Sequence, residues 1–176
     1  DGDGDSTATI DIGAVEFQDA TVTGTVFHDL NGSGLLDVGE PGLSGWTIFS
    51  DANGNGLLDT GERSAISAAD DAGTGGVDET GQYTLAVFAG TGAVVAVPRA
   101  GWIQTAPVAG NSVTVATGQT VGGILFGNAE AISIDDAVLA VEGDSGVNAL
   151  TFTVNLGAAS PNVVTVDYHT ESLAAI

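Results

Sequence analysis

Two stretches of this sequence carry oxygen-bearing side chains at the spacing of a calcium-binding loop. They read "DLNGSGLLDVGE" over residues 29–40 and "DANGNGLLDTGE" over residues 51–62, and nine of the twelve positions are identical. An EF-hand loop takes ligands from positions 1, 3, 5, 7, 9 and 12, uses the backbone carbonyl at position 7, and has glycine at position 6. Both stretches follow this pattern throughout, so the sequence predicts two sites for a hard cation.

Each loop combines three carboxylates with neutral oxygen donors, a set that suits Ca²⁺ better than the reluctantly dehydrated Mg²⁺. The ligand positions of the first loop are Asp29, Asn31, Ser33, Leu35, Asp37 and Glu40. Those of the second loop are Asp51, Asn53, Asn55, Leu57, Asp59 and Glu62. The alternative is that "NGSG" and "NGNG" are hairpin turns, because Asn-Gly is a strong hairpin signal. A turn leaves the acidic residues at positions 9 and 12 unexplained, so we favour calcium.

The sequence beside the loops does not predict the helices of an EF-hand. The strand-like "GTVFHD" leads into Asp29, and Pro41 and Gly42 follow Glu40. Elsewhere the apolar residues come in short β-branched runs between Gly, Asn and Asp, without helical periodicity. We therefore expect an all-β fold, with one β-sandwich over about 110 residues. Its strands are predicted at 21–27, 46–50, 83–88, 93–97, 112–116 and 121–126.

The residue patterns at the two ends of the chain differ from those of this sandwich. After residue 128, "ISIDDAVLAVEGDSG", "ALTFTVNL" and "NVVTVDYHT" predict three or four further strands, and "STATIDIGAVEFQ" near the start is one more strand-like piece. We expect three parts. Residues 1–20 are the tail of a preceding β module or a linker, 21–128 are the sandwich, and 129–176 begin another β domain.

The charge of the chain limits the kinds of partner that it can bind. Against 23 acidic residues stand two basic ones, Arg63 and Arg99, which gives a net charge of -21. This balance argues against nucleic acid and anionic membrane surfaces and favours cations. No apolar run is long enough to span a membrane, and the chain has no cysteine for disulfides or metal binding. Because the chain begins at Asp1 without a signal peptide, we expect a piece of a longer exported protein, at the cell surface or outside the cell.

The segment from "GTVFHDLNGSGLLDVGEPGLSGW" through "TIFSDANGNGLLDTGE", "DETGQYTL", "PRAGWIQTAP" and "VGGILFGN" resembles a known family. It is similar to the calcium-binding B-repeats of the serine-aspartate-repeat surface adhesins of bacteria, over about residues 21–128. The resemblance implies a Greek-key, prealbumin-like sandwich of the collagen-adhesin B type. It also implies calcium ligands at the twelve loop positions, a further site near Asp70, Asp71 and Asp78, and a role as a rigid spacer. The chain has no lysine, so the isopeptide bond that locks many such sandwiches cannot form, and calcium is expected to replace it.

Residues 132–170 resemble the opening of a Calx-beta domain. The matching positions are Val141, Glu142, Gly143, Ser145, Gly146, Val164, Val166, Asp167 and Tyr168. Glu142 matches a calcium-binding position in some members, but the aspartate expected after "VDY" is absent, so we interpret Glu142 as a solvated turn residue. The leading "IDIGAVEF" resembles the closing strand of extracellular right-handed β-helix domains, and we interpret "DGDGD" before it as a solvated linker.

Three other functions compete with a calcium-stabilised spacer. A partial Calx-beta domain exposes unpaired strand edges that pair readily with another chain, so the alternative is a self-assembling extracellular fibre of neighbouring copies. A carbohydrate-binding surface would need exposed tryptophans; we expect Trp46 in the core and Trp102 as the better candidate. An enzyme is not predicted, because His28 and His169 lie in different modules and no nucleophile motif is present.

Overall fold

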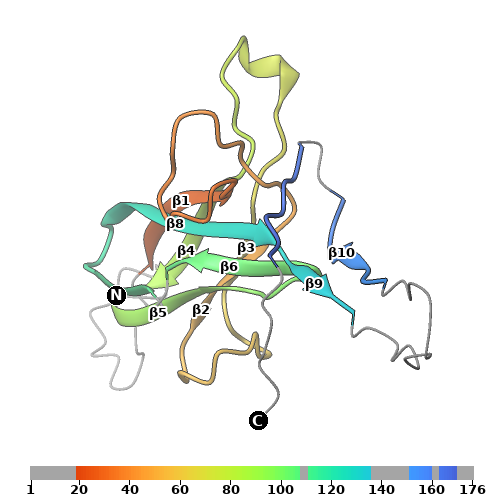
Figure 1. Ribbon diagram of the computed structural model, residues 1–176. Coiled ribbons are helices and arrows are strands. Elements are labelled where there is room, and N and C mark those ends of the chain that lie inside the picture. Colours follow the sequence, from red (N-terminus) through yellow and green to blue (C-terminus); the bar gives the residue numbers. More distant parts are fainter. Residues whose placement is uncertain (1–18, 108–110, 136–150, 160–162, 170–176) are drawn as a thin grey trace, which may run out of the picture. The chain divides into compact units, whose positions relative to one another are not determined.

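The computed structural model describes residues 19–107, 111–135, 151–159 and 163–169 (Figure 1). In these ranges the regular structure consists of ten strands and one short 3-10 helix, η1 (Ala72–Thr74), so the all-β prediction is confirmed. None of the helical structure in the same ranges is long and apolar enough to cross a membrane. The chain divides into two compact units, Asp1–Pro98 with Gln104–Ala129, and Arg99–Ile103 with Glu130–Ile176.

The first sheet has four strands in the order β4-β1-β8-β6. They are β4 (Gln82–Phe88), β1 (Asp19–His28), β8 (Thr120–Glu130) and β6 (Trp102–Ala106). β1 runs antiparallel to β4 and parallel to β8, and the register with β8 shifts between Val22 and Gly24. A side chain at Gly24 would place its Cβ 1.7 Å from the Ile124 carbonyl oxygen. Glycine here allows that carbonyl to accept a hydrogen bond from the Tyr83 hydroxyl at 3.2 Å.

The second sheet also has four strands, in the order β3-β2-β5-β7, and all neighbours are antiparallel. They are β3 (Ser64–Ile66), β2 (Thr47–Asp51), β5 (Gly90–Ala96) and β7 (Asn111–Val115). Strand β4 contacts β2 and β3 across the two sheets, and β1 contacts β7. The core therefore lies between the sheets, as in a sandwich. Its largest apolar members include Val22, Val26, Phe27, Ile48, Phe49, Leu85 and Phe126.

The second unit contains a third, two-stranded sheet made of β9 (Ile132–Ile134) and β10 (Val154–Leu156). All six residues of these strands are exposed. The predicted strand in "NVVTVDYHT" is not reproduced, because residues 163–169 adopt no regular secondary structure. Alternation of residue types does not make a strand unless a neighbour completes its hydrogen bonds. The predicted strand near the start and the Calx-beta positions at 141–146 lie outside the described residues.

The six strands predicted within the sandwich correspond to β1, β2, β4, β5, β7 and β8. Two strands were not predicted. β3 has only three residues, too few to show a periodicity, and β6 follows "PRAG", whose turn residues obscure it. Both are edge strands of their sheets. Their hydrogen bonding depends on a neighbouring strand rather than on a pattern of their own.

Tyr83 provides a test of the core. Burial raises the pKa of its hydroxyl far above the usual range. The neutral phenol therefore stabilises the fold fully below about pH 10, the ordinary tyrosine value, and this stability falls as the pH rises further. Tyr83 is one of two tyrosines, and the other, Tyr168, is 90% exposed. In a Tyr168→Phe variant we expect phenolate absorbance to appear only together with loss of the circular dichroism of the fold. The same variant in denaturant should titrate near pH 10; a folded chain that titrates there would contradict burial of Tyr83.

Candidate metal centres

The two candidate loops extend from the ends of two strands in the first unit. Loop 1 (residues 29–40) begins where β1 ends, and loop 2 (residues 51–62) begins at the last residue of β2. After loop 1 the chain turns back along β1, and the Leu43 amide donates to the Val26 carbonyl at 2.8 Å. After loop 2, Arg63 reaches the start of β1 and forms an ion pair with Asp19 at 2.7 Å. The loops thus lie at opposite ends of the unit, as Figure 1 shows in orange and gold.

The aspartate at position 1 of each loop is buried and binds the backbone of the loop. Asp29 is 1% exposed and accepts hydrogen bonds from the amides of Ser33 at 3.0 Å and Gly34 at 2.8 Å. Asp51 is 5% exposed and accepts from the amides at the same two positions, 5 and 6, at 3.2 and 2.8 Å. The glycines at position 6, Gly34 and Gly56, have φ angles of 73° and 74°, which side chains rarely adopt. The same turn is therefore built twice.

Opposing effects act on the pKa of Asp29. Burial would raise it, but interactions with the Thr105 hydroxyl and with the amides of Gly34, Ser33 and Gly32 outweigh burial and lower the pKa. The Thr105 hydroxyl oxygen is itself buried. Because the folded pKa lies below the unfolded value of about 3.9, the charged form stabilises the fold above that pH. This stability is lost as the pH falls through the folded value.

The glutamate at position 12 closes each loop. The carboxylate of Glu40 accepts from the Leu30 amide at 2.9 Å through one oxygen and from the Asp37 amide at 3.0 Å through the other. Glu62 accepts from the amides of Ala52 and Asp59, both at 2.9 Å. The last residue of each pattern is thereby tied to positions 2 and 9. A simple two-residue hairpin turn does not need this interaction.

The side chains at positions 3, 5 and 9 converge in both loops. In loop 1, the side-chain carboxamide of Asn31 and the hydroxyl of Ser33 donate to the same oxygen of Asp37, at 2.9 and 3.0 Å. In loop 2, the side-chain carboxamides of Asn53 and Asn55 donate to the same oxygen of Asp59, at 2.8 and 2.7 Å. These hydrogen bonds lower the pKa of Asp59. Each loop therefore brings three of its five predicted ligand side chains together at one carboxylate oxygen.

The remaining predicted ligands are placed differently. The Leu35 and Leu57 side chains are exposed, as expected for positions that contribute a backbone carbonyl. The Leu35 carbonyl lies 3.4 Å from the Ser33 hydroxyl and so belongs to the convergent group of loop 1. Within the described ranges, no three His, Cys, Asp or Glu side chains form a metal-binding group. The convergent set of each loop is therefore a mixed one, with one carboxylate and neutral polar groups.

The third predicted site is divided between two local turns. The Asp71 carboxylate accepts from the Gly73 amide at 2.9 Å and caps η1, and the Asp78 carboxylate accepts from the Thr80 amide at 2.9 Å. Interaction with Thr80 lowers the pKa of Asp78. Asp70 is exposed. Each of the two bonded carboxylates serves its own turn, so the structure offers no shared geometry to support this prediction.

Buried polar residues from distant strands support loop 1, and sequence patterns did not identify them. The Asp29 amide donates to the Asn128 carbonyl at 2.9 Å, and the His28 amide donates to the Pro41 carbonyl at 2.9 Å. His28 and Asn128 are each 2% exposed and are paired in the register of β1 and β8. Thr105 comes from β6. His28 directly precedes loop 1, but only the sheet order brings Thr105 and Asn128 to it, and no local spacing could have revealed those two.

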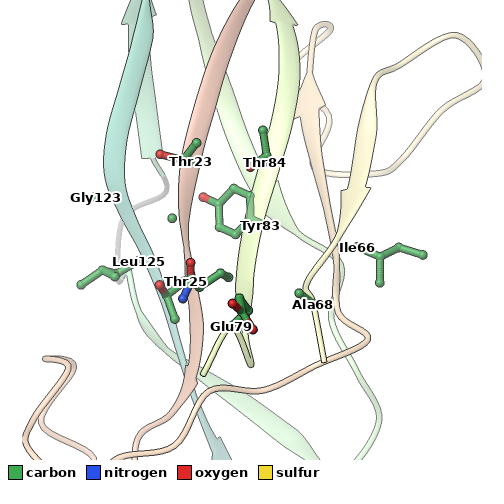
Figure 2. Close-up of a pocket in the computed structure, with 11 residues that line it drawn as sticks. Thr23, Thr25, Ile66, Ala68, Glu79, Tyr83, Thr84, Gly123 and Leu125 are labelled. Atoms are coloured by element: carbon green, nitrogen blue, oxygen red, sulfur yellow. The ribbon is translucent and has the colours of Figure 1, made fainter. Parts of the chain in front are cut away.

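Two hollows lie outside the loops. The first, of about 650 Å³, lies against β1, β4 and β8 and is drawn in Figure 2. Threonines from β1 and β4 line it together with Tyr83, and Glu79 supplies the one carboxylate among its lining residues. These groups form no nucleophile and base pair. Trp46, considered for sugar stacking, is 3% exposed and packs in the core.

The second hollow belongs to the second unit and has a volume of about 800 Å³. It lies among β9, β10 and residues 163–169, and most of its lining is apolar. The apolar lining residues are Ile132, Ile134, Phe152, Val154, Val164, Val166 and Tyr168.

No protein-family model matches this chain, and no curated protein is significantly similar to it. The function must therefore be argued from the loops and from the surfaces described above.

Replacing Asp29 tests the role of the buried carboxylate without any metal. In chelator, Asp29→Ala should lower the free energy of unfolding in urea by about 1–3 kcal/mol, because the Gly34 amide loses its acceptor and the Ser33 amide keeps only Asn31 Oδ1, at 2.8 Å. The matched variant is Asp37→Ala, which removes an exposed carboxylate from the same loop and should change stability by less than about 0.5 kcal/mol. Equal losses in both variants would show that burial of Asp29 is not what anchors the loop.

Proposed function

We propose that this chain is a calcium-stabilised, non-catalytic structural module of a bacterial surface or extracellular protein, acting as a spacer. The observation that carries the proposal is the repeated hydrogen-bond network of loops 1 and 2. In both loops, the carboxylate at position 1 accepts hydrogen bonds from the backbone amides of positions 5 and 6. The carboxylate at position 12 accepts from the backbone amides of positions 2 and 9. The carboxylate at position 9 accepts from the side chains at positions 3 and 5. Two turns that only reversed the chain would not need the same three-part network.

The donor chemistry of the loops suits Ca²⁺. Every candidate ligand is a carboxylate, carboxamide, hydroxyl or carbonyl group, and hard oxygen donors are what this ion binds. Around Asp37 and Asp59 the polar side chains already lie within hydrogen-bonding distance of one carboxylate oxygen. A cation there would require Asn31, Asn53 and Asn55 to present the carboxamide oxygen instead of the nitrogen. The side chains are exposed, so this rotation is sterically open.

Electrostatics favours the same ion. The chain has a net charge of -21, and such self-repulsion opposes a compact state. Each loop adds three carboxylates within twelve residues. A divalent cation bound only by the folded loops would stabilise the fold by mass action, by about 4 kcal/mol per site at a free concentration a thousandfold above its dissociation constant. A chain without cysteine or lysine has neither disulfides nor lysine isopeptide bonds to take this role.

A structural role agrees with where the loops lie. They are attached at opposite ends of the first unit, through Asp29 after β1 and Asp51 at the end of β2. Their carboxylates bind backbone amides, which rigidifies the loops. This use is suited to holding shape rather than to transferring protons. An extracellular setting would supply calcium at the concentrations that weak loop sites require.

Calcium binding can be counted directly. Metal analysis and calorimetry of the purified chain should find two Ca²⁺ ions, and the thermal unfolding midpoint should fall in excess chelator. Glu40→Gln and Glu62→Gln should each remove one ion, because each weakens a different loop. Asp70→Asn and Asp78→Asn are charge-matched controls that also test the third site. If they leave the count at two, that site is absent. A melting temperature unchanged by chelator would defeat the proposal.

A second candidate function is a fibre subunit that pairs with copies of itself. The observation that favours it is the second unit, where every residue of the three-residue strands β9 and β10 is exposed beside the apolar hollow of about 800 Å³. A two-stranded sheet of this size is marginally stable alone. A further strand from another copy would complete its hydrogen bonds and cover the hollow. In this reading calcium would reduce the repulsion between acidic copies.

Light scattering at several protein concentrations decides between the spacer and the fibre. If the chain is a fibre subunit, the average particle mass should increase with protein concentration. Phe152→Ser, within the hollow, should reduce that increase. The matched control is Val163→Ser, because Val163 is 91% exposed and does not line the hollow. A chain that stays monomeric with calcium at all concentrations would exclude the fibre and leave the spacer.

A further inference from the structure

Loop 2 contains two Asn-Gly pairs, Asn53-Gly54 and Asn55-Gly56, and all four residues are exposed. Asparagine before glycine is chemically labile, because glycine has no side chain to shield its backbone nitrogen. Once deprotonated, that nitrogen can attack the carboxamide carbon of the preceding asparagine. The loop that is predicted to bind a metal therefore also contains residues capable of spontaneous modification.

The reaction has two steps and needs only water. In the first, the glycine nitrogen loses its proton and bonds to the asparagine Cγ, and the Cγ–Nδ2 bond breaks to release ammonia and leave a cyclic succinimide. In the second, water adds to one of the two succinimide carbonyls and opens the ring. Opening on one side gives aspartate, and opening on the other gives isoaspartate. In both cases one carboxamide and one water become one carboxylic acid and ammonia.

The structure holds the attacking nitrogens in other interactions. The Gly54 amide donates to one oxygen of Asp51 at 2.7 Å, and the Gly56 amide donates to the other oxygen at 2.8 Å. Loss of a proton from either nitrogen would break a hydrogen bond and would place a negative charge against a buried carboxylate. A single side chain thus restrains both nucleophiles.

The attacked groups are restrained as well. The Asn53 and Asn55 carboxamides donate to one oxygen of Asp59, at 2.8 and 2.7 Å. Their oxygens accept from the amides of Asn55, at 3.0 Å, and Leu57, at 2.7 Å. Each carboxamide would have to rotate out of these bonds to meet the following nitrogen. The space around both glycines is otherwise open, with nothing within 4 Å of a Cβ built there, so water has access once the bonds break.

We propose that Asn53 and Asn55 are deamidation sites whose reaction is held back by the Asp51 carboxylate. The hydrogen bonds that carry this proposal are present without metal, so it does not depend on calcium binding. Aspartate at either position keeps a residue type that the calcium-loop pattern accepts and adds one negative charge. Isoaspartate instead lengthens the backbone by one methylene and displaces the residues that follow. The same reaction therefore either adds a carboxylate to the loop or distorts it.

The test follows deamidation by peptide mass spectrometry in mildly alkaline buffer with chelator. Asp51→Asn keeps the size of the side chain but leaves one acceptor oxygen for the two glycine amides. We expect deamidation at Asn53 or Asn55 to accelerate about tenfold, which corresponds to about 1.4 kcal/mol of lost restraint. Asn31-Gly32, in loop 1, is a reporter within the same chain and should not change. Glu62→Gln is the matched control, because it removes the same charge from the same loop but frees neither glycine amide.

Two outcomes would overturn the proposal. One is an unchanged rate at both Asn53 and Asn55 in the folded Asp51→Asn chain, and the other is an equal acceleration in the Glu62→Gln chain. If Asp51→Asn does not fold, the wild-type chain decides. Amide hydrogen exchange should show Gly54 and Gly56 protected, and deamidation at Asn53 and Asn55 should be at least tenfold slower in the folded chain than in urea. Equal rates in the folded and unfolded chains would also overturn the proposal.

Discussion

The interaction on which the loops depend is a buried carboxylate that binds backbone amides. Asp29 and Asp51 sit where strands β1 and β2 end, and each accepts from the amides at positions 5 and 6 of its own loop. A buried charge is tolerated only when hydrogen bonds compensate it, so the loop must fold tightly around the carboxylate. The glutamate at position 12 and the convergent side chains of positions 3, 5 and 9 are positioned by that first turn. The sheets hold the two aspartates and thereby replace the helices that normally flank such a loop.

Arg63, one of the two basic residues of the chain, connects two elements of the first unit. Arg63 follows loop 2, pairs with Asp19 at 2.7 Å and lies over the Phe88 ring at 4.0 Å. Asp19 and Phe88 face each other in the register of β1 and β4, so the guanidinium joins the second loop to the edge of the first sheet. The Asp19 carboxylate of this ion pair is exposed, so the pair contributes little by itself. The Arg63 side chain also covers the Phe88 ring, and this adds contact area to the electrostatic attraction.

Features set by residues close together in the chain could be predicted from the sequence. Contacts between residues that are distant in the chain could not. The all-β class and six strands of the sandwich followed from residue type and period, and the glycines at positions 6 do have the positive φ that the loop pattern requires. β3 and β6 were missed because short edge strands show no period of their own. Thr105 and Asn128 come to loop 1 through sheet order, which spacing along the chain does not contain. The Asp70, Asp71 and Asp78 site stays a prediction, because the Asp71 and Asp78 carboxylates each bind an amide of their own turn.

The parallel pairing of β1 with β8 has a mechanical consequence. These are the first and last strands of the sandwich along the chain, and they are hydrogen-bonded neighbours over Thr21 to His28. Tension that enters the sandwich before β1 and leaves after β8 pulls two parallel strands in opposite directions along their length. The hydrogen bonds between them are then loaded in shear and must fail together, whereas an antiparallel pair joined by a hairpin opens one bond at a time. Strand direction alone makes this pair resistant to stretching.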